Sequence, residues 1–146
     1  MNWSIWEDIE NLPDYEGKGV YKVRIVSYKE KSISIQRFLD EDKDGIIMIG
    51  KADNIKKRLK QFNKIVTERK KYPHSEGLTI HLLRKIPKFK EKYGTCTFQY
   101  TFSKVGEPTE EEKKLLESYF IYYGELPPLN YKREFISSKK IRELHF

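Results

Sequence analysis

Two stretches of the sequence decide the fold: VYKVRIVSY, from Val20 to Tyr28, and IIMI, from Ile46 to Ile49, which Gly50 ends. The first is rich in β-branched and aromatic residues and alternates apolar with polar positions, which predicts a half-buried strand. The second is short and continuously apolar, which predicts a central strand buried on both faces. If the two strands pair antiparallel, the start of the first lies beside the end of the second. Tyr21 and Gly50 are therefore predicted to be neighbours.

The next elements follow from spacing and capping signals. A helix is predicted to begin at an N-cap, Asp53, and to run to about Lys71. Its predicted buried stripe consists of Ile55, Leu59, Phe62 and Val66, which recur at helical spacing. Thr97 to Val105 alternates aromatic and polar residues and predicts a half-buried strand. Thr109-Glu110-Glu111-Glu112 predicts a capping box that opens another helix, which Gly124 ends.

The remaining segments predict shorter elements. Ser4 is expected to cap a short helix that ends before Pro13. Ser32 to Phe38 alternates and predicts a further strand. Leu78 to Lys92 predicts a helix that Pro87 breaks or kinks. Taken in order, the elements predict an α+β fold, with a small, mainly antiparallel central sheet flanked by helices.

The chain has 146 residues and a hydrophobic share of 38%, and no repeat or linker interrupts it, so residues 1–146 are predicted to form a single domain. Cys96 is the only cysteine and cannot close an intramolecular disulfide, which indicates a reducing compartment. No stretch approaches the ~20 apolar residues that span a bilayer. Glu7, Asp8 and Glu10 stand where a signal peptide would carry basic residues. We therefore expect a cytoplasmic protein with no membrane partner.

The net charge of +7 is unevenly distributed. From Lys51 to Lys71 the basic residues Lys51, Lys56, Lys57, Arg58, Lys60, Lys64, Arg69, Lys70 and Lys71 outnumber the acidic Asp53 and Glu68. A one-sided field of this kind attracts a polyanion, and phosphate backbones are the commonest polyanion. The alternative is that a lysine-rich face only keeps the protein soluble.

Arg58 differs from the other cations of the predicted basic helix. At 100° per residue, Lys56, Lys57, Lys60 and Lys64 lie about 90° or more from the buried stripe. Arg58 lies only about 70° from it, so its side chain is predicted to point toward the edge of the sheet. A guanidinium in that place can clamp a phosphate with two hydrogen bonds. The alternative is a surface arginine paired with a carboxylate.

The ordered motifs resemble those of the GIY-YIG nuclease family. Gly19-Val20-Tyr21, then Met48-Ile49-Gly50-Lys51, then Arg58 are similar to the first half of the family pattern. Glu117 and Asn130 are similar to the family's acidic helix residue and closing asparagine. The resemblance covers about residues 19–130. The segment of about residues 27–45 looks longer than the family's usual connection, so we interpret it as an insertion.

The resemblance implies a role for each motif residue in phosphodiester hydrolysis. Tyr21 would position or deprotonate the attacking water, and because a phenol has a pKa of about 10 it would need a nearby cation such as Lys22, Lys51 or Arg58. Arg58 would stabilise charge on the scissile phosphate. Glu117 would be the sole protein ligand of a Mg²⁺ or Mn²⁺ ion.

Two further residues and a set of lysines complete the predicted site. His74 is expected to assist proton transfer, with His81 as the competing candidate, and Asn130 is expected to orient neighbouring groups. The implied substrate is DNA, with RNA as the alternative. The predicted nucleic-acid-binding residues are Lys22, Lys51, Lys57, Lys60 and Lys64. Because one small domain reads few bases, specificity would come from a homodimer or a partner.

One departure from the family pattern separates the functional hypotheses. Met48 replaces the family's second tyrosine and has no hydroxyl, so Tyr28 or Tyr100 would have to supply one if it is needed. The leading hypothesis is a metal-dependent endonuclease, and the alternative is a degenerate module that binds nucleic acid without cutting it. A third hypothesis is an unrelated basic α+β domain that binds RNA or a protein. Singly, each motif residue also has an ordinary structural explanation, such as a core tyrosine or a solvated helix glutamate.

Overall fold

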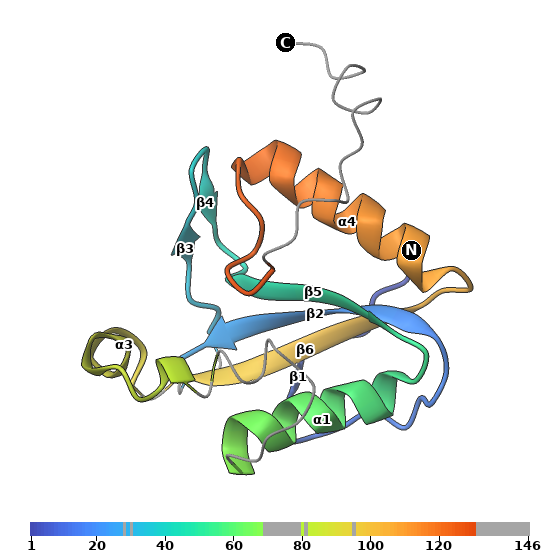
Figure 1. Cartoon of the computed structure of the whole chain (residues 1–146), viewed down its shortest axis with the longest axis horizontal. Coiled ribbons are helices and arrows are strands. Elements are labelled where there is room, and N and C mark those ends of the chain that lie inside the picture. The colour runs from blue at the N-terminus through green and yellow to red at the C-terminus, as the bar shows by residue number, and fades with distance from the viewer. Residues whose placement is uncertain (28, 30, 69–79, 81, 95, 131–146) are drawn as a thin grey trace.

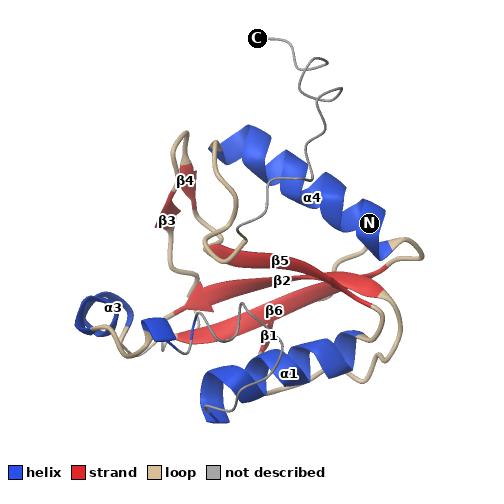
Figure 2. Cartoon of the chain, viewed as in Figure 1, coloured by secondary structure: helices blue, strands red, loops and turns tan. Residues whose placement is uncertain are grey.

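The centre of the fold is β2 (Gly19–Val26), which pairs antiparallel with β5 (Ile46–Ala52) on one side and with β6 (Thr97–Lys104) on the other. β1 (Glu7–Asp8) adds to β6, so the strand order is β1-β6-β2-β5. The structure is a computed structural model that describes residues 1–27, 29, 31–68, 80, 82–94 and 96–130. Figure 1 shows α1 (Ile55–Glu68) and α4 (Pro108–Tyr123) on opposite faces of this sheet. The predicted α+β fold with a mainly antiparallel sheet is confirmed, as the distribution of helices and strands in Figure 2 shows.

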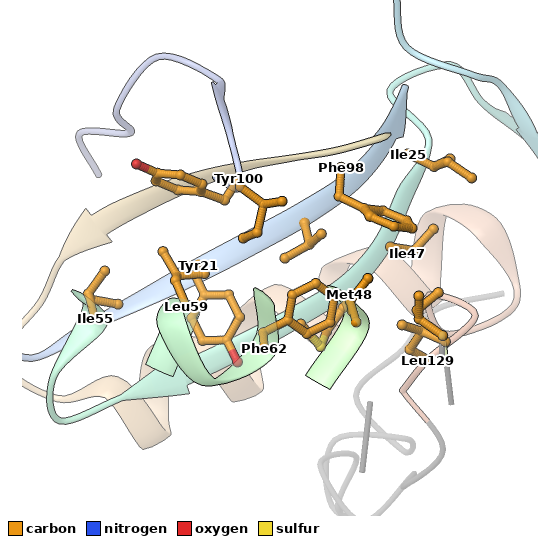
Figure 3. Packing of buried hydrophobic residues seen from close by; sticks show 14 residues of the cluster. Tyr21, Ile25, Ile47, Met48, Ile55, Leu59, Phe62, Phe98, Tyr100 and Leu129 are labelled. Carbon is orange, nitrogen blue, oxygen red and sulfur yellow. The ribbon is translucent and has the colours of Figure 1, made fainter. Parts of the chain in front are cut away.

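Two hydrophobic layers hold the helices on the sheet. One layer lies between the sheet and α1 and includes Tyr21, Met48, Leu59 and Phe62, which Figure 3 shows together. The predicted stripe of α1 is confirmed, because Ile55, Leu59, Phe62 and Val66 are all at most 4% exposed. The second layer packs Ile46 and Ile49 of β5 against Leu116 and Tyr119 of α4. The apolar run of β5 therefore serves both faces, as predicted for a strand without polar alternation.

The predicted helix at the N-terminus is wrong, because this segment pairs with β6. The backbone N–H of Ser4 donates to the carbonyl of Phe102 at 2.8 Å, and the N–H of Phe102 donates to the Ser4 hydroxyl at 3.0 Å. Further along, Glu7 pairs with Tyr100. β6 would otherwise present an edge of unpaired backbone groups, and the N-terminal segment satisfies them. This long-range demand outweighs the local capping signal of Ser4.

The helix boundaries differ in part from the predicted ones. α4 begins at Pro108, and the residue before it makes no side-chain capping bond, so the predicted capping box at Thr109 is wrong. Proline suits the first helical position because its missing N–H would have no partner there. Gly124 ends α4 with φ 73°, as predicted. α3 (Pro87–Tyr93) likewise begins at a proline, which confirms the predicted break at Pro87.

Between β2 and β5 the chain forms a separate small hairpin, β3 (Ile35–Gln36) with β4 (Glu41–Asp42). The predicted strand from Ser32 to Phe38 is reduced to β3. The hairpin lies beside the C-terminal end of α4, where the Leu39 N–H donates to the carbonyl of Tyr123 at 2.9 Å (Figure 1). In the part of the chain that the structure describes, no helix is long and apolar enough to cross a membrane.

Candidate active site

The first and second motifs meet at one end of the sheet. Tyr21 of β2 pairs with Gly50 of β5, as predicted from antiparallel pairing. The Tyr21 ring lies so close over Gly50 that a Cβ at position 50 would collide with the ring and the hydroxyl. Gly50 is therefore required by packing, and it fixes where the Tyr21 side chain runs. The ring is 1% exposed, so β2 and the core hold it in one place.

Arg58 approaches the same hydroxyl from α1. Its Nε donates a hydrogen bond to the Tyr21 hydroxyl oxygen at 3.2 Å, which agrees with its predicted direction on the helix. The start of α1 is anchored by the loop before β2, because the N–H groups of Ile55 and Lys56 donate to backbone carbonyls at positions 17 and 15. Asn54, not the predicted Asp53, caps the helix: its Oδ1 accepts the Lys57 N–H at 3.0 Å.

An open cleft of about 820 Å³ lies over this pair, between the N-terminal turns of α1 and α4 at the β5 edge. Lys51 of β5 lines the cleft, and its Nζ donates to the Thr109 hydroxyl of α4 at 3.0 Å. Tyr21, Gly50 and Asn130 also line the cleft. The charged residues of the lining are Lys51, Lys57, Arg58, Asp53 and Glu112. Cations prevail in the cleft, which suits an anionic ligand.

Asn130 joins the chain after α4 to β5. β5 is the edge strand, and the Asn130 side-chain amide makes both bonds that a neighbouring strand would make to Ile49. Its Oδ1 accepts the Ile49 N–H and its Nδ2 donates to the Ile49 carbonyl, each at 3.0 Å. The Leu129 N–H donates to the Ile47 carbonyl at 2.9 Å in the same way. Asn130 therefore fixes the backbone beside Gly50, which is compatible with its predicted orienting role.

The acidic residues of α4 differ in whether they line the cleft. Glu117 is half-buried and follows Leu116, a cleft residue, but Glu117 is not itself part of the cleft lining. Glu112 is part of the lining. The sequence contained the signal for Glu112, because residues 109, 112 and 116 share one helical face. It was not singled out because no motif includes it.

The predicted cationic residues separate into two groups. Lys51, Lys57 and Arg58 line the cleft, whereas Lys22, Lys60 and Lys64 do not. Lys22 follows Tyr21 in β2 and so points to the opposite face of the sheet. There its Nζ lies 4.3 Å from the Trp3 ring centre, and burial lowers the pKa of Lys22 while Asp44 and Asp42 oppose that shift. Lys22 is therefore not one of the cations beside the Tyr21 hydroxyl.

No described tyrosine other than Tyr21 brings its hydroxyl to the cleft. Met48 is 1% exposed and packs in the α1 layer of the core. Tyr100 donates its hydroxyl to the Asn11 carbonyl at 2.7 Å, so it does not replace the missing one. Tyr28, together with the predicted His74 and its competitor His81, lies outside the described residues.

Comparison with known proteins agrees with the arrangement of the motifs. A family model described as GIY-YIG domain-containing protein matches residues 7–122, well over half of the chain. The matched region includes Tyr21, Gly50, Arg58 and Glu117, and Asn130 lies just beyond it. No curated protein and no solved structure matches the chain.

Proposed function

The chain belongs to the GIY-YIG domain family, a nuclease-type family, and from this premise we propose that it is a metal-dependent endonuclease that hydrolyses DNA phosphodiester bonds. The observation that carries the proposal is the hydrogen bond from Arg58 Nε to the Tyr21 hydroxyl inside a cationic cleft. The Tyr21 phenol is 1% exposed, and its oxygen accepts the Arg58 N–H where both residues line the cleft.

We assign different roles to Tyr21 and Arg58. Tyr21 would orient or deprotonate the attacking water, and the N–H that Arg58 donates would hold the Tyr21 hydroxyl in place. Arg58 carries further N–H donors on the same planar group, and these would bind an oxygen of the scissile phosphate. Because Gly50 has no side chain, the Tyr21 ring can lie directly against β5.

The donor atoms around the cleft suit a hard cation. Glu112 and Asp53 line it, and carboxylates are the side chains that Mg²⁺ and Mn²⁺ prefer. Among the described residues, no three His, Cys, Asp or Glu side chains gather as a metal-binding group, so an ion would take most of its ligands from water and phosphate. We propose Glu117 as its protein ligand, following the family pattern. When bound, the ion would stabilise negative charge on the phosphate as a Lewis acid.

The other predicted residues take supporting roles in the proposal. Lys51 and Lys57 would hold the backbone at the cleft, and Lys60 and Lys64 would extend the basic surface along α1. Asn130 would keep the β5 end in place through Ile49. His74 stays a proposed proton-transfer residue. We further infer a cytoplasmic location, from the single cysteine, and specificity that arises from a homodimer or a partner, because one small domain reads few bases.

The proposal is tested by plasmid nicking with Mg²⁺ or Mn²⁺, and with EDTA, for the parent and for Tyr21→Phe. Phenylalanine keeps the buried ring and its contact with Gly50, so the fold should persist while nicking is lost. Arg58→Ala should lower the rate by about 10²–10³, since it removes transition-state charge stabilisation. Arg58→Lys should restore little of it, because a point charge does not reproduce a planar fork. Metal-independent nicking, or a Tyr21→Phe variant as active as the parent, would contradict the proposal.

One observation favours a second candidate function, a module that binds nucleic acid without cutting it. Met48 stands where the family has a tyrosine, and no described tyrosine supplies that hydroxyl to the cleft. A shift of DNA mobility without cleavage under any divalent ion would support this candidate. The same assay with an RNA duplex distinguishes the two substrates.

A further inference from the structure

Glu112 lines the cleft because α4 has one fixed rotation on the sheet. Leu116 is 7% exposed and packs with Ile49, which sets the direction of this helical face. Glu112 lies one turn earlier on the same face, and Thr109 lies one turn earlier still. All three residues line the cleft.

Cations from two other elements line the same cleft as Glu112. Lys51 reaches α4 from the end of β5 through its 3.0 Å contact with Thr109, one turn from Glu112. Lys57 and Arg58 line the cleft from α1. A phosphate that enters between these cations and α4 is attracted by the former and repelled by Glu112. A divalent cation held between the carboxylate and a phosphate oxygen would turn that repulsion into attraction.

We infer that Glu112 makes binding of a phosphate backbone in this cleft depend on a divalent cation. The inference rests on the proposed function in one respect, namely that the cleft receives a nucleic-acid backbone. It goes beyond the family pattern, which places a single acidic residue, Glu117, in the site. In the absence of the ion Glu112 keeps phosphates out of the cleft, and with the ion it supplies an oxygen that holds the ion or its water.

The experiment measures DNA affinity by fluorescence anisotropy of a short labelled duplex, in EDTA and in Ca²⁺ at matched ionic strength. Ca²⁺ serves as a hard, oxygen-binding ion. The parent should bind about 3–10-fold more tightly with Ca²⁺ than with EDTA, as expected for one partly screened charge near a phosphate. Glu112→Gln should bind in EDTA nearly as tightly as the parent does in Ca²⁺, and should gain little when Ca²⁺ is added.

Glu110→Gln is the matched control, because Glu110 is an exposed acid in the first turn of α4 that does not line the cleft. It removes the same charge near the same helix end and should behave like the parent. Thermal unfolding confirms that each variant is folded. The inference is overturned if the parent shows no Ca²⁺ effect or no DNA binding, or if Glu112→Gln gains as much from Ca²⁺ as the parent does.

Two further experimental outcomes distinguish this inference from the proposed function. If Glu117→Gln loses the Ca²⁺ gain while Glu112→Gln keeps it, the cation depends on Glu117 alone and the role of Glu112 is refuted. If the parent binds with the expected cation dependence but never cuts with Mg²⁺ or Mn²⁺, the endonuclease proposal fails and the role of Glu112 stands. The same preparations serve for both measurements.

Discussion

The two ends of α4 use polar side chains in opposite ways. At its N-terminal end the helix lines the open cleft, where Lys51 meets Thr109 and Arg58 meets Tyr21 across different elements. At its C-terminal end Tyr119 donates its hydroxyl to Asp42 of the β3–β4 hairpin at 2.7 Å. Asp42 is only 1% exposed. Polarity and burial alone therefore do not identify a site. Tyr21 and Asp42 are equally buried, but Tyr21 lines the open cleft and Asp42 does not.

The Asp42 carboxylate accepts several hydrogen bonds at the hairpin end. Besides the Tyr119 hydroxyl, its carboxylate accepts the N–H of Asp44 at 3.0 Å and that of Ile46 at 3.2 Å. Burial, followed by the hydrogen bond to Asp42, raises the pKa of Tyr119 well above its ordinary value. The contact keeps a proton on Tyr119. The pair joins the hairpin, β5 and α4, and neither residue lines the cleft.

The largest expected effect comes from Glu117→Gln, in the middle of α4 between these two ends. The substitution keeps size and helix propensity but removes the charge that we propose as the metal ligand, so metal-dependent cleavage should disappear while the fold persists. DNA binding should survive or tighten, because a negative charge near the phosphates has gone. Cleavage and gel-shift assays on one preparation, with circular dichroism for folding, measure this. A variant that cuts like the parent would refute a Glu117-bound metal.

Tyr119→Phe should lower the stability of the fold and leave cleavage unchanged, and its effect should be smaller than that of Glu117→Gln. It leaves the buried Asp42 without one donor and should lower the free energy of unfolding by about 1–3 kcal/mol. Cleavage per folded molecule should not change, because the Tyr119 hydroxyl is bonded to Asp42 of the hairpin and no role in the proposed chemistry falls to it. Denaturant unfolding and the nicking assay together check this. An activity loss without a loss of stability would show that the hairpin end takes part in the chemistry.

The raised pKa of Tyr119 adds a pH dependence to this prediction. The folded-state pKa exceeds the unfolded value of about 10, so the folded state retains a proton that the unfolded state loses. The corresponding stability is present below about pH 10 and is lost as the pH rises above it. Tyr119→Phe should therefore show a shallower alkaline loss of stability than the parent. An unchanged slope would show that other groups, such as Tyr123, control it.

The comparison also explains which features the sequence could predict. The buried stripe of α1 and the direction of Arg58 depend on helical spacing and were predictable. The register of Tyr21 with Gly50 was predictable because it follows from antiparallel pairing of two recognisable strands. The strand pairing of the N-terminal segment and the use of Asn130 as a partner for Ile49 depend on an exposed sheet edge. That edge exists only once the topology is formed, so local signals could not reveal it.

The candidate site was predictable to the extent that motifs mark it. Lys22 was grouped with the site because it adjoins Tyr21 in the sequence, although strand alternation turns it to the other face. Glu112 was missed for the opposite reason, because it lies outside every motif and its position depends on how Leu116 sets the rotation of α4. The roles of Glu117 and His74 stay predictions.

The smallest expected effects concern lysines inside and outside the cleft, and they locate the path of the backbone. Lys57 lines the cleft, whereas Lys64, nearly two turns along α1, does not. If the backbone follows α1, each of Lys57→Ala and Lys64→Ala should weaken duplex binding a few-fold and reduce the slope of log affinity against log salt by about 1. Both losses should be independent of DNA sequence, because phosphate contacts carry no base information. If instead the backbone only enters the cleft, Lys64→Ala should bind like the parent at every salt concentration.

Lys88→Ala on α3 is the matched control, because it removes the same charge outside the cleft and away from α1. Equal effects from Lys64 and Lys88 would mean that overall positive charge, and not the α1 surface, attracts the DNA.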